Sequence, residues 1–290
     1  MKKIKLFISI FLFVNISLLF AFDWPQSGVT GSEQIYSYFG QYRGDTISNS
    51  LIFSDPSEVK TASQGRILIT ISEHSDLCDF FPSTLGNAVL ISHEDNLVTV
   101  YGNLDKTTIP ENLFEKKFVE KAEVIGFTGN SAWQQGHSSL EFQVIDTKND
   151  TSINPRVLLP RVGKELPLYY NELFIRNKNG NSYNLSKVNT VPAGHYRVYK
   201  KRQAIAVPYK EKISLNGSVI DQITFDVLFQ DDNLICVAGK TKYTKNVLYP
   251  DDNLILMGEL FLSPGTNALQ LNLIDILGKE TPATYILSVY

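Results

Sequence analysis

Histidine and cysteine, the side chains that most often hold transition metals or act as nucleophiles, are scarce in this chain. Its 290 residues include four His and two Cys, and the first His is His74. Cys78 and Cys236 are too few for a disulfide framework, so two buried thiols are the simpler expectation. The chain shows no Gly-rich phosphate loop and no Ser-His-Asp or Cys-His signature, which excludes those mechanisms from the first hypotheses.

Basic charge is also in short supply. The formal net charge is −3, and it becomes −6 (−3 − 3) if Lys2, Lys3 and Lys5 leave with an N-terminal segment. A mildly acidic chain without a basic patch cannot neutralise many phosphates, so nucleic-acid binding is not expected. The hydrophobic content of 43% is ample for packed cores, and 290 residues fit two domains of ordinary size.

Residues 1–21 have the features of a secretory signal. Basic residues at the start precede an apolar run over Leu6–Phe20, and Ala21 is a small residue before a cut at Phe22. An uncleaved membrane anchor is the alternative, but the run is short for a full span of about 20 residues. We therefore expect an exported protein of the periplasm or cell envelope, which contacts the membrane only if this segment stays attached.

The stretch over residues 136–144 carries the clearest local pattern. Its sequence alternates polar and apolar side chains, which is typical of a half-buried strand. The apolar set should face a core, while the polar set is left to line a site. The alternating residues are Ser139, Leu140, Glu141, Phe142, Gln143 and Val144.

Seven motifs in order, including this strand, resemble the M23 (LytM or lysostaphin-like) family of zinc peptidases that cut peptidoglycan cross-links. The resemblance covers about residues 22–162 and implies an antiparallel β-sheet domain related to the duplicated hybrid motif. The motifs are Trp24-Pro25 with Phe39-Gly40 and Arg43; Ser48–Pro56; Val59–Gly65; Tyr101–Leu104; Val124–Ser131; residues 136–144; and Ile153-Asn154-Pro155 with Leu158-Leu159.

The same resemblance implies that the chemistry has been lost. In the family, H-x-G-x-D, Y-x-H-L and G-p-H-L-H-F-E supply the zinc ligands and catalytic histidines, and the corresponding positions are Ser48, Ile52, Asn103, Ser139 and Glu141. Zinc hydrolysis needs about three protein ligands and one open position. Isoleucine cannot bind a metal, asparagine cannot act as a general base, and one carboxylate does not hold Zn²⁺. We therefore expect no catalytic residues and no metal, with these five positions lining a groove.

Three functions remain open at this point. The favoured one is a non-catalytic binding or regulatory module in cell-wall maintenance, with peptidoglycan or an envelope protein such as a wall hydrolase as partner; degenerate LytM proteins that activate amidases are the family precedent. The second is an active zinc murein endopeptidase with a displaced site, for example one using His74, His93 and Glu141. The third is a structural envelope protein. For every histidine, including His137 and His195, an ordinary surface or hydrogen-bonded side chain is the simpler expectation.

The rest of the chain, about residues 166–290, has a different sequence pattern. Short alternating runs separated by turn clusters recur about every ten residues, which predicts a β-sandwich similar to bacterial Ig-like modules. The expected domains are residues 22–163 and 166–290, joined by a charged, exposed linker at Gly163-Lys164-Glu165. The runs are Leu173–Arg176, His195–Tyr199, Ala204–Val207, Thr224–Phe229, Leu234–Ala238, Leu254–Leu262, Ala268–Ile274 and Tyr285–Tyr290.

Overall fold

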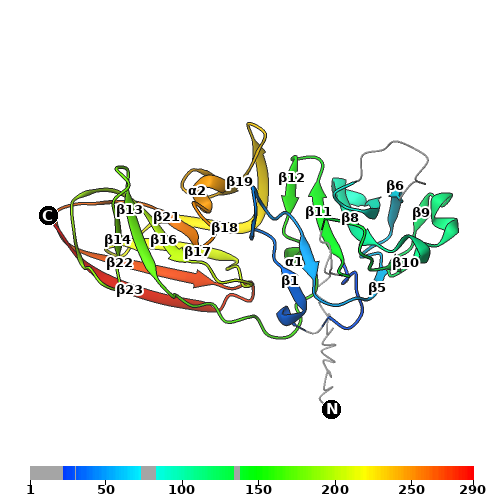
Figure 1. Cartoon of the computed structure of the whole chain (residues 1–290), viewed down its shortest axis with the longest axis horizontal. Coiled ribbons are helices and arrows are strands. Elements are labelled where there is room, and N and C mark those ends of the chain that lie inside the picture. Colours follow the sequence, from blue (N-terminus) through cyan, green and yellow to red (C-terminus); the bar gives the residue numbers. More distant parts are fainter. Residues whose placement is uncertain (1–21, 30, 73–82, 134–137) are drawn as a thin grey trace, which may run out of the picture.

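The protein is mainly β and elongated, with its two halves end to end along the long axis (Figure 1). The structure is a computed structural model that describes residues 22–29, 31–72, 83–133 and 138–290. The expected signal at 1–21 lies outside the described residues, as do His74, Cys78 and His137. In the described part of the chain, no helix has the length and apolar character needed to cross a membrane.

The first half is built from short strands with a few single-turn helices between them. Among its described residues, the 3₁₀ turns are η1 (Ser32–Gln34), η2 (Glu94–Asn96), η3 (Lys106–Thr108) and η4 (Glu111–Phe114), and the one α-helical turn is α1 (Pro155–Leu158). Its strands are β1 (Ile35–Ser37), β2 (Tyr42–Arg43), β3 (Thr46–Ile47), β4 (Leu51–Phe53), β5 (Glu58–Lys60), β6 (Gly65–Ile71), β7 (Asn87–Ser92), β8 (Leu97–Leu104), β9 (Phe118–Val119), β10 (Val124–Phe127), β11 (Glu141–Asp146) and β12 (Thr151–Ile153).

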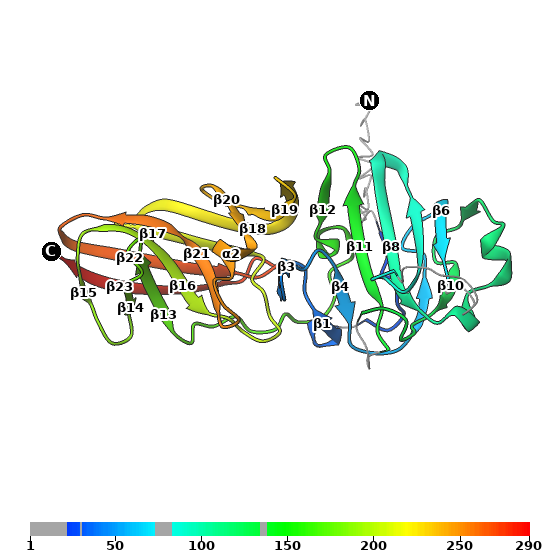
Figure 2. The ribbon, with the colours of Figure 1, turned by 45° about the horizontal axis from the view of Figure 1, so that its top comes forward.

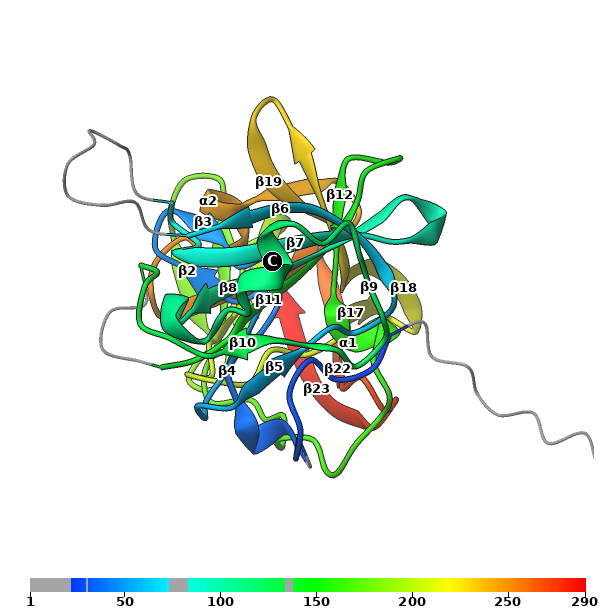
Figure 3. The same ribbon diagram turned by 90° about the vertical axis from the view of Figure 1, so that its right-hand side faces the viewer.

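Strand β11 lies in the interior of the first half, within the order β12-β11-β8-β7-β6-β9 (Figure 2). Turning the molecule to view it along the long axis brings β6, β7 and β8 to the front (Figure 3). The strand begins at Glu141 rather than in the preceding turn, and the expectation of a half-buried strand is wrong. Residues 141–144 are buried on both faces, because other side chains cover the polar face as well.

The second half contains eleven strands and one α-helical turn, α2 (Lys245–Leu248). The strands are β13 (Leu173–Asn177), β14 (Ser182–Asn184), β15 (Thr190–Val191), β16 (Gly194–Lys201), β17 (Lys210–Leu215), β18 (Ser218–Asp231), β19 (Leu234–Ala238), β20 (Lys242–Thr244), β21 (Leu254–Leu262), β22 (Gly265–Ile274) and β23 (Glu280–Val289).

These strands form two facing sheets. One sheet has the order β14-β13-β16-β21, and the other runs β15-β23-β22-β17-β18. Their inner faces share one apolar cluster that includes Ile175, Val198 and Met257 from the first sheet and Leu271 and Leu287 from the second. Most of the predicted runs are strands, but 204–207 is not. The strand in this region is β17, a few residues later, where Lys210 and Lys212 obscure the alternation.

The two halves share both a sheet and a core. Strand β12 of the first half pairs antiparallel with β18 of the second, with Ser152 opposite Leu228. The larger apolar cluster also takes residues from both halves. In the segment predicted to be an exposed linker, the Glu165 side chain is only 9% exposed and forms an ion pair with Arg156. The predicted domain limits stay a prediction.

A buried hydrogen bond closes this joint. The Tyr249 hydroxyl donates to the Gly40 carbonyl at 2.5 Å. Gly40 has a φ of +84°, and a Cβ there would lie 2.5 Å from the Phe225 ring. Glycine is therefore required at this position both for its conformation and for its close approach to the second half.

The Tyr249→Phe substitution should destabilise the whole chain, not one half. It leaves the buried Gly40 carbonyl without this donor, which costs about 1–3 kcal/mol. Calorimetry should show one unfolding transition at a lower temperature in the variant, because the halves share a core. A variant that keeps the wild-type transition, or loses stability in only one of two separate transitions, would contradict a shared joint.

Candidate functional site

The five predicted site positions converge at one end of β11. Glu141 lies opposite Ile52 of β4 on one side and opposite Gly102 of β8 on the other. Asn103 follows Gly102 on β8, Ser139 precedes β11, and Ser48 precedes β4. Sequence positions more than 90 apart are therefore brought together by strand pairing alone, since β4 and β8 both pair with β11.

These side chains do not line an open groove, which corrects the expectation from the sequence. Ser48 and Asn103 are 0% exposed, and Ile52, Ser139 and Glu141 are 1% exposed. The polar face of β11 is covered, so its groups bond to protein. The cover includes Arg43, which the sequence argument named only as part of a motif and gave no role at the site, and Trp133, which it did not name.

The Arg43 guanidinium holds the Glu141 carboxylate in a bidentate ion pair. Its Nη1 donates to Oε1 at 2.8 Å and its Nη2 donates to Oε2 at 3.2 Å. The guanidinium carbon lies 3.8 Å from the centre of the Trp133 ring, and the Trp133 Nε1 donates to Oε2 at 2.9 Å. The Gln143 amide adds a donor to Oε1 at 3.2 Å. Arginine suits this position because its planar fork matches a carboxylate and stacks on an aromatic face.

The charge of Glu141 is stabilised by these partners despite its burial. Burial would raise the pKa of this carboxyl, but the hydrogen bonds and charge of Arg43, with further bonds from Trp133 and Ser50, hold the pKa below its ordinary value. The carboxylate is thus ionised and paired with a fixed cation. It is not free to bind a metal or accept a proton near neutral pH.

The Asn103 side chain forms hydrogen bonds with the backbone of neighbouring segments. It adopts a left-handed φ of +64°, which asparagine tolerates better than most residues. Its amide nitrogen donates to the Ser139 carbonyl at 2.7 Å, and its amide oxygen accepts from the backbone nitrogens of Ser131 and Ala132 at 2.9 Å each. This side chain ties the end of β8 to the segments before β11, and an amide supplies no general base.

The displaced zinc site considered from the sequence would use His74, which lies outside the described residues, and His93. The His93 ring forms hydrogen bonds with other protein groups. Its Nδ1 donates to the Gln64 carbonyl at 2.8 Å, and its Nε2 lies 2.7 Å from the Thr99 hydroxyl. Burial lowers the pKa of His93, although the bond to Gln64 opposes that shift. It therefore matches the expectation of an ordinary hydrogen-bonded histidine.

The residues present do not fit the zinc that the family resemblance implies. A guanidinium cation already lies against the only carboxylate of the set, and a divalent metal cation there would be repelled. Ile52 offers no donor atom. Within residues 22–29, 31–72, 83–133 and 138–290, no group of three or more His, Cys, Asp or Glu is placed to hold a metal ion.

Comparison with known proteins identifies the class. Residues 50–155 match the family model of peptidase family M23, and residues 167–290 match a second family model. A protein of Treponema pallidum (strain Nichols), described as uncharacterized, is 31% identical over 128 residues, covering 41% of this chain and 84% of the relative. The chain carries an M23 domain and belongs to the same family as the treponemal protein.

Several solved structures are similar to this chain at low identity. The catalytic domain of the prophage-encoded M23 protein EnpA of Enterococcus faecalis is 20% identical with a TM-score of 0.34, covering 42% of this chain and 88% of that one. A SpoIIIAH and SpoIIQ complex is 16% identical with a TM-score of 0.35, and the match covers 47% of this chain and 98% of that one. A zinc-containing peptidase of Vibrio cholerae is 21% identical with a TM-score of 0.32, and the match covers 42% of this chain and 35% of that one.

The Glu141→Gln substitution should lower stability in a pH-dependent way. It leaves Arg43 partly buried and unpaired, which costs about 3 kcal/mol when one partner of a buried pair is removed. Because the folded-state pKa is lowered, the carboxylate contributes fully above its unfolded-state pKa of about 4.3 and loses this contribution as the pH falls through the folded value. Denaturant unfolding at several pH values measures the difference.

Asp231→Asn is the matched control, because Asp231 pairs with Lys242 on the surface, where the two side chains are 44% and 56% exposed. Such pairs contribute about 1 kcal/mol or less. Equal effects of the two substitutions, or a Glu141→Gln effect that does not shrink in acid, would contradict the role assigned to the Arg43 pair.

Proposed function

We propose that this chain is an exported, non-catalytic M23-like protein that acts as a binding or regulatory module in cell-wall maintenance. One observation carries the proposal. Where the family resemblance calls for a metal and its ligands, this chain has a guanidinium bonded to both oxygens of Glu141 and stacked on Trp133. The M23 domain is kept while the groups needed for hydrolysis are replaced by ones that stabilise each other.

Arg43 and Trp133 are also the part of this cluster that a partner would meet. The Trp133 residue is 45% exposed and the Arg43 side chain is 21% exposed, whereas Glu141 is 1% exposed. An indole face stacks on sugar rings and apolar side chains, and the guanidinium edge donates hydrogen bonds to acceptors. Peptidoglycan, or an envelope protein such as a wall hydrolase, supplies such groups. The cationic ligand that an unpaired Glu141 would favour is not proposed, because Arg43 already fills that role.

The purified protein should contain no stoichiometric zinc and should not cleave peptidoglycan. The reason is the donor set: Ile52 and a carboxylate already paired with Arg43 cannot complete a site for Zn²⁺. Elemental analysis of protein prepared without chelators, beside an active M23 peptidase treated identically, measures this. About one zinc per chain, whose removal abolishes cleavage, would instead establish the displaced-site endopeptidase.

The Trp133→Ala variant should lose binding to the envelope partner while it remains folded, with a lower melting temperature because the buried Glu141 carboxylate loses one donor. Phe118→Ala is the control, because Phe118 is 63% exposed in the same half. Co-sedimentation with purified peptidoglycan, and a pull-down with a wall hydrolase, measure the two partner classes. If both variants bind as well as wild type does, the interaction lies away from Arg43 and Trp133. If wild type binds neither partner, the structural-protein alternative gains support.

A further inference from the structure

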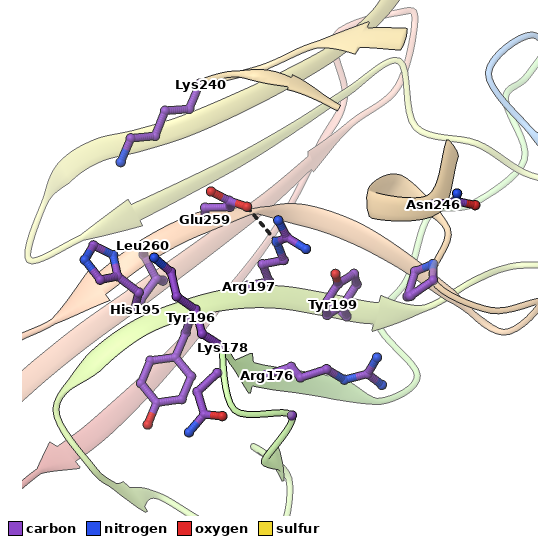
Figure 4. A pocket seen from close by; sticks show the side chains of 13 residues that line it. Arg176, Lys178, His195, Tyr196, Arg197, Tyr199, Lys240, Asn246, Glu259 and Leu260 are labelled. Atoms are coloured by element: carbon purple, nitrogen blue, oxygen red, sulfur yellow. Dashed lines mark hydrogen bonds and ion pairs between the residues drawn. The ribbon is translucent and has the colours of Figure 1, made fainter. Parts of the chain in front are cut away.

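A separate cavity of about 780 Å³ lies in the second half, on the outer side of the sheet β14-β13-β16-β21 (Figure 4). This volume is in the range of ordinary small-molecule sites, about 300–1,000 Å³. Its walls come from β13 and the turn after it, from β16 and β21, from the turn between β19 and β20, and from α2 and the segment after it. The charged lining residues are Arg176, Lys178, Arg197, Lys240 and Glu259.

Three of these residues form one row across three neighbouring strands. Arg176 of β13 lies directly opposite Arg197 of β16, and Arg197 lies directly opposite Glu259 of β21. Like charges directly opposite each other on adjacent strands destabilise a sheet. Only one arginine of the pair is neutralised, because the Arg197 Nε donates to the Glu259 carboxylate at 2.6 Å (Figure 4).

The remaining positive charge in the cavity has no acidic partner. Among the described residues, the charged side-chain groups of Arg176, Lys178 and Lys240 form no ion pair with a carboxylate, although the Lys240 backbone nitrogen donates to Asp221 at 2.6 Å. The Arg176 guanidinium instead lies 5.3 Å from the Tyr199 ring centre. Four cations and one carboxylate line the cavity, a formal charge of +3 (4 − 1). The whole chain has a formal charge of −3. Positive charge is therefore gathered in a concave place on an acidic protein, where the field is focused.

The lining also offers neutral groups that fix orientation. The amides of Asn177 and Asn246 and the imidazole of His195 border the charged row, and His195 packs edge-on against Phe261 with ring centres 4.8 Å apart. Arginine presents a planar fork that binds two oxygens of one anionic group, and lysine adds a mobile point charge. Together these groups match a ligand that carries several phosphate or carboxylate groups.

We propose that this cavity is a binding site for a multivalent anion bearing phosphate or carboxylate groups. Arg176 and Lys178 bind the anionic groups, Lys240 approaches from the opposite wall, and Glu259 competes with the ligand for Arg197. The site is independent of the M23 domain, so it stands or falls separately from the proposed envelope role.

Titration calorimetry of the full chain with tripolyphosphate, and separately with citrate, tests this site at 50 and 200 mM salt. Binding at one site per chain is expected, weaker at the higher salt because counterions screen the charges. The double variant Arg176→Gln/Lys178→Gln should bind about tenfold or more weakly, since charge-assisted hydrogen bonds are lost. The probe that binds more tightly identifies phosphate or carboxylate as the recognised group.

Two further variants make the test specific. Arg66→Gln/Lys279→Gln removes the same charge from exposed positions outside the cavity and should change the affinity less than about twofold. Glu259→Gln should tighten binding, because it frees Arg197 for the ligand. The proposal is overturned if wild type binds neither probe at one site per chain, if both double variants weaken binding equally, or if Glu259→Gln weakens it. Lys178→Gln alone, at an exposed turn, keeps the test valid should Arg176→Gln alter folding.

Discussion

A carboxylate buried at the end of an interior strand constrains everything around it. Glu141 is 1% exposed, and an ionised group in such a place must be paired and fully hydrogen-bonded. Arg43 supplies the charge, while Trp133 and Gln143 supply the remaining donors. This requirement fixes the short hairpin that carries Arg43 and the segment that carries Trp133 over the polar face of β11, and it converts a face expected to be open into a closed one.

The arrangement around Glu141 shows that the family fold and the groups needed for catalysis are separate features of the chain. The M23 domain is a matter of strand order and apolar packing, which do not depend on the side chains at the predicted zinc positions. Catalysis depends on a few donor atoms with an open coordination position, and the one carboxylate among the five predicted site positions is already bonded to a guanidinium. The proposed binding role rests on this combination of a family strand order with site side chains that are bonded to each other. The continuous sheet through β12 and β18 adds that the second half is part of the same mechanical unit, not a loosely tethered module.

Alternation was enough to predict most strands of the second half, because it reports directly on sheet structure. The grouping of the five site positions came instead from the family resemblance. Alternation also predicted β11, with a small error at its start. It failed for β17, where lysines obscure the period, and it assigned an open face to residues 139–143. The sequence carried no signal that Arg43 would reach Glu141, since the two are 98 positions apart and only the fold brings them together. The shared core of the halves was missed for the same reason.

The central claim is that a guanidinium, and not a metal, is the cation at Glu141. A crystal structure grown with excess zinc, with anomalous data collected at the zinc edge, tests it most directly. The account predicts that both Glu141 oxygens accept hydrogen bonds from Arg43 and that no anomalous peak lies within metal-ligand distance of them, about 2.0–2.2 Å. A zinc peak bonded to Glu141, with Arg43 displaced, would contradict the account.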